Sequence, residues 1–216
     1  MSLIDISPAL HAGTAVWPGD VALSRSVALS IAEGANIDLS SITTTVHIGA
    51  HADAPSHYVA EGEHIAQRSL DRYYGPCQVM RVPGVRGRRI RVGDLPDPVR
   101  APRVLLHTGT FPDPDAFNTD FAALSPELVE HLADEGVVLV GIDTPSVDPF
   151  DSKALESHQA IARHDMSVLE GIVLDHVPPG AYTLIALPLK LVGADASPVR
   201  AALLPTSPAK DPPTEG

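Results

Sequence analysis

The chain has 216 residues, a length that suits one sizeable hydrophobic core and therefore one domain. Hydrophobic residues make up 44% of it and charged residues 19%, which excludes an intrinsically disordered, collagen-like or coiled-coil protein. With 15 Lys and Arg against 27 Asp and Glu, the formal net charge is −12, and this charge repels nucleic-acid phosphates and anionic lipid headgroups. We expect no nucleic-acid partner and no membrane partner.

Cysteine content and the N-terminal residues indicate where the protein works. The single cysteine, Cys77, can form no internal disulfide and cannot build a Cys-rich zinc site. The first residues, MSLIDISPAL, lack the basic and apolar segments of an export signal, and no apolar run approaches the roughly 18 residues of a membrane helix. We therefore expect a cytoplasmic protein.

Patterns of apolar residues predict a mixture of strands and helices. The expected strands lie within Val21–Ile31, Ile37–Ile48, Cys77–Val82, Ile90–Val92, Arg103–Leu106, Val137–Ile142, Ala181–Leu187 and Val199–Leu204. The expected helices are Pro126–Glu135, with Ser125 as N-cap and Gly136 after its end, and Lys153–Arg163. The predicted class is α/β, one domain over residues 1–208 with a mixed β-sheet flanked by helices, followed by a frayed polar tail at 209–216.

Four potential metal ligands lie within eleven positions of the segment V-H-I-G-A-H-A-D-A-P-S-H-Y, namely His47, His51, Asp53 and His57. All four have odd numbers, so an extended chain would direct them to one side, and Pro55 disrupts a helix. We expect a strand that ends near His47 and continues into a tight loop. Imidazole and carboxylate are the ligands of Zn²⁺ where thiolates are absent, and Mn²⁺ or Fe²⁺ accept the same set. The alternative is a loop of solvated histidines.

The motif H-x-G-x-H-x-D-x-P-x-H at 47–57 resembles the signature of the metal-dependent cyclase-like hydrolases, and in particular that of their bacterial arylformamidase branch. The resemblance continues in the same order in W-P-G-D at 17–20, G-I-D-T-P-S-V-D at 141–148, S-H-Q-A-I-A-R-H-D-M-S-V-L-E-G at 157–171 and L-P-L-K-L at 187–191. It covers most of the chain. It implies a cyclase-like fold, with a swivelling β/β/α arrangement, and a homodimer. Ala50 stands where many members of the wider family have Thr, and it favours the formamidase branch.

The resemblance also implies a binuclear site with two divalent metal ions per subunit, Zn²⁺ or alternatively Mn²⁺. His47 and His51 would bind one ion, Asp53 would bridge the two, and His158 and Glu170 would complete the second site. The charges agree with two cations, because +4 from the ions, −2 from the two carboxylates and −1 from a bridging hydroxide leave a cluster of +1 that can be buried. With one ion, five ligands would crowd a site that catalysis needs open.

The implied activity is hydrolysis of an aromatic formamide, N-formyl-L-kynurenine, to L-kynurenine and formate. His57 would be the catalytic proton shuttle, although the sequence also allows it to be a third metal ligand. Trp17 would lie in the substrate pocket, although a large aromatic residue is more often part of the core. The rival functions are a hydrolase of cyclic amides such as isatin and a non-catalytic metal-binding module. The sequence contains no G-x-S-x-G motif of a serine hydrolase and no nucleotide-binding motif.

The other polar residues have simpler interpretations. Asp143 and Ser146 follow a buried strand, where functional residues often lie, but a turn at Thr144–Pro145 explains them equally well. The Arg86–Arg91 cluster is expected to be a solvated loop face, with recognition of a substrate carboxylate or a partner subunit as the alternative. The remaining histidines lie singly and are expected in surface or core positions: His11, His64, His107, His131, His164 and His176.

Overall fold

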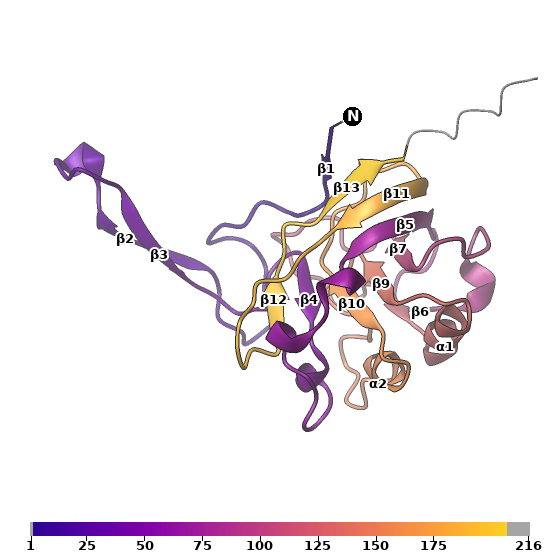
Figure 1. Ribbon diagram of the computed structural model, residues 1–216. Coiled ribbons are helices and arrows are strands. Elements are labelled where there is room, and N and C mark those ends of the chain that lie inside the picture. Colours follow the sequence, from indigo (N-terminus) through magenta and orange to yellow (C-terminus); the bar gives the residue numbers. More distant parts are fainter. Residues whose placement is uncertain (1, 207–216) are drawn as a thin grey trace, which may run out of the picture.

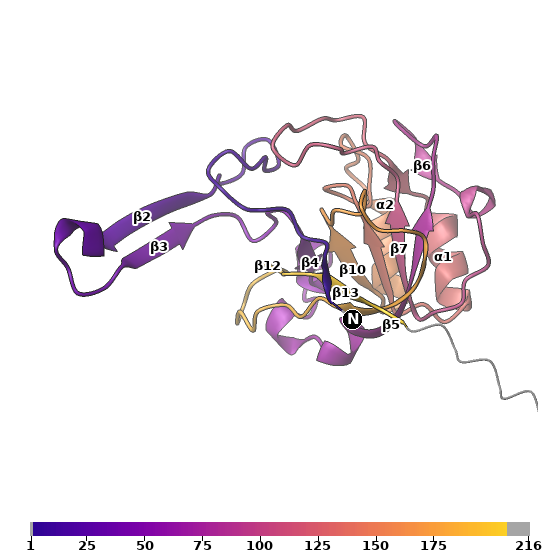
Figure 2. The ribbon, with the colours of Figure 1, turned by 90° about the horizontal axis from the view of Figure 1, so that it is seen from above.

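The computed structural model describes residues 2–206 (Figures 1 and 2). The predicted tail at 209–216 lies outside the described residues, and the domain boundary at 208 stays a prediction. Within the described part, nine strands form one mixed sheet in the order β1-β13-β11-β5-β7-β9-β10-β4-β12. These strands are β1 (Ile4–Asp5), β4 (His51–Asp53), β5 (Tyr74–Arg81), β7 (Arg103–His107), β9 (Leu139–Ile142), β10 (Ser167–Glu170), β11 (Gly180–Ile185), β12 (Ala196–Pro198) and β13 (Ala202–Pro205).

The centre of the sheet is parallel and covered on both faces. Strands β5, β7, β9 and β10 pair in parallel, and the strands on either side of them are antiparallel. Every residue of β7 and β9 is buried, as the apolar runs in the sequence predict for strands packed on both faces. Because side chains alternate along a strand, Val104 and Leu106 join the hydrophobic cluster on the helical face, whereas Leu105 joins the cluster on the opposite face.

Two helices pack on one face of the sheet, α1 (Pro126–Asp134) and α2 (Glu156–Arg163) (Figure 1). The start of α1 is as predicted, because the Ser125 hydroxyl accepts the Leu128 N–H at 3.1 Å, and Gly136 follows its end with φ of +80°. Helix α2 begins at Glu156, three residues later than the predicted Lys153. The predicted α/β class with helices against a mixed sheet is confirmed.

Strands β2 (Ser24–Leu29) and β3 (Leu39–Thr43) form a separate hairpin, called here the arm, which projects away from the sheet (Figures 1 and 2). Every residue of both strands is exposed. The predicted strand Ile37–Ile48 was too long, because β3 loses its pairing partner where Ser24 meets Thr43. The following residues bend back to the sheet, and Gly49 adopts φ of +54° there.

Short elements complete the described chain. Strands β6 (Arg89–Ile90) and β8 (Ala123–Leu124) pair in parallel as a second small sheet. The 3₁₀ turns are η1 (Ile31–Glu33), η2 (Pro55–His57), η3 (Ile65–Gln67), η4 (Leu70–Arg72) and η5 (Val92–Asp94). Neither helix of residues 2–206 has the length and the apolar character needed to cross a bilayer.

Candidate metal centre

Three parts of the chain that are distant in sequence meet at the end of the sheet. His47 lies in the bend after the arm, and His51 and Asp53 lie on β4. Strand β10 pairs with β4 so that Glu170 is opposite His51. Helix α2 adds His158 from the neighbouring layer. The structure thus brings together all five residues that the sequence analysis selected as metal ligands.

Asp53 lies at the centre of this cluster, with one carboxylate oxygen toward each half. Its Oδ1 is 3.0 Å from His47 Nδ1 and 3.4 Å from His51 Nε2, and its Oδ2 is 3.6 Å from His158 Nε2. The Glu170 carboxylate spans the other side, with Oε2 3.3 Å from His51 Nε2 and Oε1 3.4 Å from His158 Nε2. Two groups of donors that could hold an ion follow from these distances, His47–His51–Asp53 and Asp53–His158–Glu170, and the described residues form a third such group farther out, His47–His57–Asp195.

The buried atoms of the cluster lack the hydrogen bonds that their burial requires. His51 Nε2, His158 Nε2 and both Asp53 oxygens have no aligned hydrogen-bond partner among the described residues. A buried polar atom left in this way costs about 1–3 kcal/mol. In the neutral rings, Nδ1–H of His51 donates to the Gly49 carbonyl at 2.8 Å and Nδ1–H of His158 donates to Asp148 at 2.9 Å, so each Nε2 presents a lone pair. This donor set fits divalent metal ions.

Charges within the cluster shift the pKa values of its members. Burial alone would lower the pKa of His47, but the nearby Asp53 carboxylate and the hydrogen-bonded Asp195 raise it to about 9. Burial would likewise raise the pKa of Asp53, but the neighbouring imidazoles of His158 and His47 hold it well below the usual value. Without a metal ion, the imidazoles therefore retain protons beside carboxylates, and a cation must displace these protons in order to bind.

His57 lies at the outer edge of the cluster, together with a carboxylate that the sequence analysis missed. Nδ1 of His57 is 3.2 Å from Asp195 Oδ2, and the same oxygen is 2.9 Å from His47 Nε2. Strand β12 pairs with β4 so that Ala196 is opposite Asp53, and this pairing positions the preceding residue, Asp195, beside His47 and His57. No local spacing in the sequence marks Asp195, because its position depends on that pairing.

The expected strand that ends near His47 and continues into a tight loop is only partly confirmed, because β3 already ends at Thr43 and the short strand β4 interrupts the loop. Only His51 and Asp53 lie on a strand, whereas His47 lies in a bend and His57 ends the turn η2. Their side chains converge because the chain folds around β4, and the ring centroids of His47 and His57 lie 4.1 Å apart.

A cavity of about 360 Å³ opens beside the cluster, and His57, His158 and Trp17 all line it. The Trp17 ring is half-buried and packs at centroid distances of 5.0 Å from Phe150 and 5.5 Å from Phe117. Trp17 therefore belongs both to an aromatic cluster and to the cavity wall, so the two interpretations of this residue are compatible.

The other polar residues singled out in the sequence also have defined places. Asp143 and Ser146 both line the cavity, and Asp143 accepts the Thr108 and Gly109 N–H groups at 2.8 Å. The expectation that all of Arg86–Arg91 is a solvated face is wrong for Arg89, which donates to the buried Asp148 at 2.9 Å.

Comparison with known proteins agrees with this geometry. The model of the Cyclase family matches residues 4–149. The kynurenine formamidase of Delftia acidovorans is 48% identical over 204 residues, which cover 93% of this chain and 96% of that protein. A solved structure described as a potential metal-dependent hydrolase with cyclase activity is 29% identical with a TM-score of 0.82, covering 96% of this chain and 99% of that one.

A more distant structure shows the same fold. Isatin hydrolase A from Labrenzia aggregata has a TM-score of 0.75 at 18% identity, covering 94% of this chain and 93% of that one. The fold and the cluster of His, Asp and Glu donors define a cyclase-like metal-dependent hydrolase. The chain belongs to the Cyclase family, and the fold predicted from the resemblance is confirmed.

Proposed function

We propose that the protein is an arylformamidase that hydrolyses N-formyl-L-kynurenine to L-kynurenine and formate, a step of tryptophan degradation. The observation that carries this proposal is the 48% identity to a kynurenine formamidase over nearly the whole of both chains. The donor cluster beside an aromatic-walled cavity supplies the kind of site that the reaction needs.

We infer that the centre holds two divalent ions, and we favour Zn²⁺, with Mn²⁺ as the alternative. In this assignment His47 and His51 would hold one ion, His158 and Glu170 would hold the other, and Asp53 would be shared by both. The inference is supported by the two oxygens of Asp53, each of which faces a different group of imidazoles. When bound, such ions supply Lewis-acid polarisation of the formyl carbonyl and lower the pKa of water toward neutrality.

His57 is proposed as the residue that moves the proton. A carboxylate can only accept, so the Nδ1–H of His57 donates to Asp195, and in the neutral ring Nε2 remains free to take a proton. His57 would take a proton from the attacking water and deliver it to the leaving amine nitrogen as the C–N bond breaks. The donors of the cluster are more deeply buried than His57, which agrees with its role as a shuttle rather than a ligand.

Trp17 is proposed as the aryl-binding residue of the cavity. Its neighbours Phe117 and Phe150 hold the ring at the cavity wall, and an aromatic substrate would add one more partner to this cluster. The formamide group would then face His57 and His158, which line the same cavity.

We also propose that the protein is a cytoplasmic homodimer. An isolated two-stranded hairpin is only marginally stable in water, yet the arm exposes apolar side chains such as Val27, Leu39 and Ile42. A second copy of the chain that covers the arm would remove this exposure. Light scattering should therefore give twice the mass of one chain, and the Ile42→Glu variant should give the mass of a single chain. The single, buried Cys77 suits a reducing compartment.

Formate release tests the proposed function. Purified protein with its metal restored is assayed with N-formyl-L-kynurenine and, in parallel, with ring amides such as isatin. The proposal predicts formate and L-kynurenine in equal amounts and little opening of isatin. Brisk opening of isatin with N-formyl-L-kynurenine left intact would instead indicate a cyclic-amide hydrolase, and metal binding without either reaction would indicate a non-catalytic module.

A further inference from the structure

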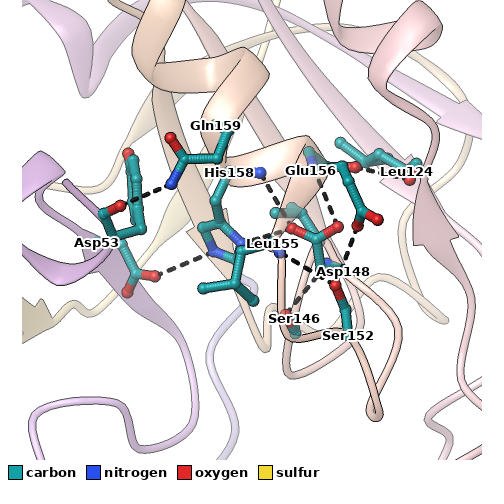
Figure 3. A network of polar contacts seen from close by, with 12 residues as sticks. Asp53, Leu124, Ser146, Asp148, Ser152, Leu155, Glu156, His158 and Gln159 are labelled. Atoms are coloured by element: carbon teal, nitrogen blue, oxygen red, sulfur yellow. Dashed lines mark hydrogen bonds and ion pairs between the residues drawn. The ribbon is translucent and has the colours of Figure 1, made fainter.

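Asp148 is a fully buried carboxylate that holds His158 from the side opposite Asp53. Figure 3 shows the His158 ring between the two carboxylates. The Asp148 Oδ2 accepts the backbone N–H of His158 at 3.0 Å and its ring Nδ1–H at 2.9 Å. This contact fixes the direction of the ring, so that in the neutral imidazole Nδ1 carries the proton and the Nε2 lone pair faces Asp53 and Glu170.

The other oxygen of Asp148 is held by Arg89. Asp148 Oδ1 accepts from Arg89 Nη1 at 2.9 Å and from the Ser157 N–H at 3.1 Å. The same guanidinium donates to the Leu124 carbonyl at 2.6 Å, to the Ser157 hydroxyl at 2.8 Å and to the Glu156 carboxylate at 2.6 Å. Arg89 is thus clamped between β8 and the start of α2, and its position is set by four acceptors.

This arrangement also caps α2. The residue before the helix, Leu155, offers no side-chain cap, and Asp148 accepts the N–H groups of Ser157 and His158 in its place. A carboxylate at a helix N-terminus is favourable, but a buried one without a cationic partner is costly. Arg89 supplies that partner from outside the metal centre.

We propose that Arg89, acting through Asp148, is a positioning residue for His158 and sets the metal affinity of the Asp53–His158–Glu170 group. This inference rests on the proposed two-ion site. Its effect should be confined to one half of the centre, because His51 is oriented by the Gly49 backbone carbonyl and has no hydrogen bond or ion pair with Arg89 or Asp148 among the described residues.

Metal titration of the full-length, metal-stripped protein tests the proposal. Co²⁺ is the probe, and its visible absorbance reports each binding step. Asp148→Asn keeps the shape of the side chain, but its amide N–H₂ would face His158 Nδ1, favour the wrong tautomer and weaken one step about 10–100-fold. Arg89→Met should weaken the same step about 10-fold, and Arg89→Lys, which keeps the charge, should recover part of the loss.

The neighbouring Arg88 offers a matched control. Its side chain forms two 2.8 Å bonds with Asp94 and one 3.0 Å bond with the Arg89 backbone carbonyl, and among the described residues it has no hydrogen bond or ion pair with Asp148 or the metal centre, so Arg88→Met should leave both steps unchanged. Urea unfolding of each metal-free variant separates positioning from general loss of structure. If Arg89→Met fails to fold, the Co²⁺ affinities of Asp148→Asn and Arg89→Lys test the positioning role instead.

Three outcomes overturn the positioning role: unchanged Co²⁺ affinity in Asp148→Asn, equal weakening of both steps in proportion to lost stability, or a single Co²⁺ step in the wild type. Another combination of results would contradict the proposed function but not the positioning role. If the wild type binds two Co²⁺ ions and the variants weaken one step, yet no formate is released, the positioning role stands and the arylformamidase assignment fails.

Discussion

The metal centre has an inner edge, formed by Asp53, His158 and Glu170, and an outer edge, formed by His57 and Asp195. The two edges differ in how their side chains are held and in how much solvent reaches them. Asp53, His158 and Glu170 come from a strand, a helix and a second strand, and all three are almost fully buried. At the outer edge, 35% of the His57 side chain and 47% of the Asp195 side chain are exposed. One site thus combines buried donors suited to binding cations with exposed groups suited to exchanging protons.

Removal of the shared carboxylate should have the largest effect. Asp53→Ala deletes a donor from both groups, so metal content should fall toward zero and formate release should drop roughly 10³-fold or more. Elemental analysis beside the formate assay checks this expectation. Asp115→Ala, at an exposed carboxylate paired with His11, is the control and should leave both readings unchanged. Full metal content in Asp53→Ala would contradict the shared role.

Removal of the proton shuttle should separate chemistry from metal binding. His57→Ala should retain its metal but lose about 10²–10⁴-fold in kcat, the usual contribution of general acid–base catalysis. Elemental analysis should show unchanged metal content, whereas the formate assay should show the loss of turnover. Loss of metal from His57→Ala would instead show that His57 is a metal ligand, and it would contradict the separate functions of the inner and outer edges.

A glycine next to Glu170 tests how tightly the inner edge is packed. Gly171 has φ of +63°, and a Cβ there would lie 2.2 Å from the Gly49 carbonyl oxygen. Gly171→Ala should therefore destabilise the protein by about 2–4 kcal/mol and weaken metal binding. Gly193→Ala, at φ of +81° with open space around it, carries backbone strain alone and should cost about 1 kcal/mol. Equal urea midpoints for the two variants would refute the close approach.

The smallest expected effect is a pH dependence that only the metal-free protein shows. The pKa of His47 is raised from 6.5 to about 9, so its contribution to stability is complete below pH 6.5 and is lost as pH rises through 9. Unfolding of metal-free protein should become easier across that window, whereas a bound cation replaces the proton and flattens the profile. Identical pH profiles with and without metal would contradict this linkage.

Local sequence signals predicted part of this molecule well. The buried strands β7 and β9 and the capped helix α1 follow from apolar runs and from Ser125 and Gly136, which act over a few residues. The histidine segment was recognised from its spacing alone, although the loop expected after His47 contains the short strand β4. Spacing could not place His158 and Glu170 beside it, and only the family resemblance did so.

The remaining features depend on contacts between distant segments. Strand β10, which carries Glu170, has only four residues and was not predicted as a strand. Asp195 reaches His57 through pairing of β12 with β4, and Arg89 reaches Asp148 across 59 positions of sequence. The arm was predicted as strands, but alternation alone did not reveal that the apolar residues of the arm would be exposed.

Anomalous diffraction from crystals of the zinc-loaded protein would locate each bound ion relative to Asp53 and His57. Two peaks should flank Asp53, one beside His47 and His51 and the other beside His158 and Glu170, with His57 in contact with neither. A single peak, or a peak held by His57 and Asp195, would contradict the assignment of two ions to buried donors and of the proton to the outer edge.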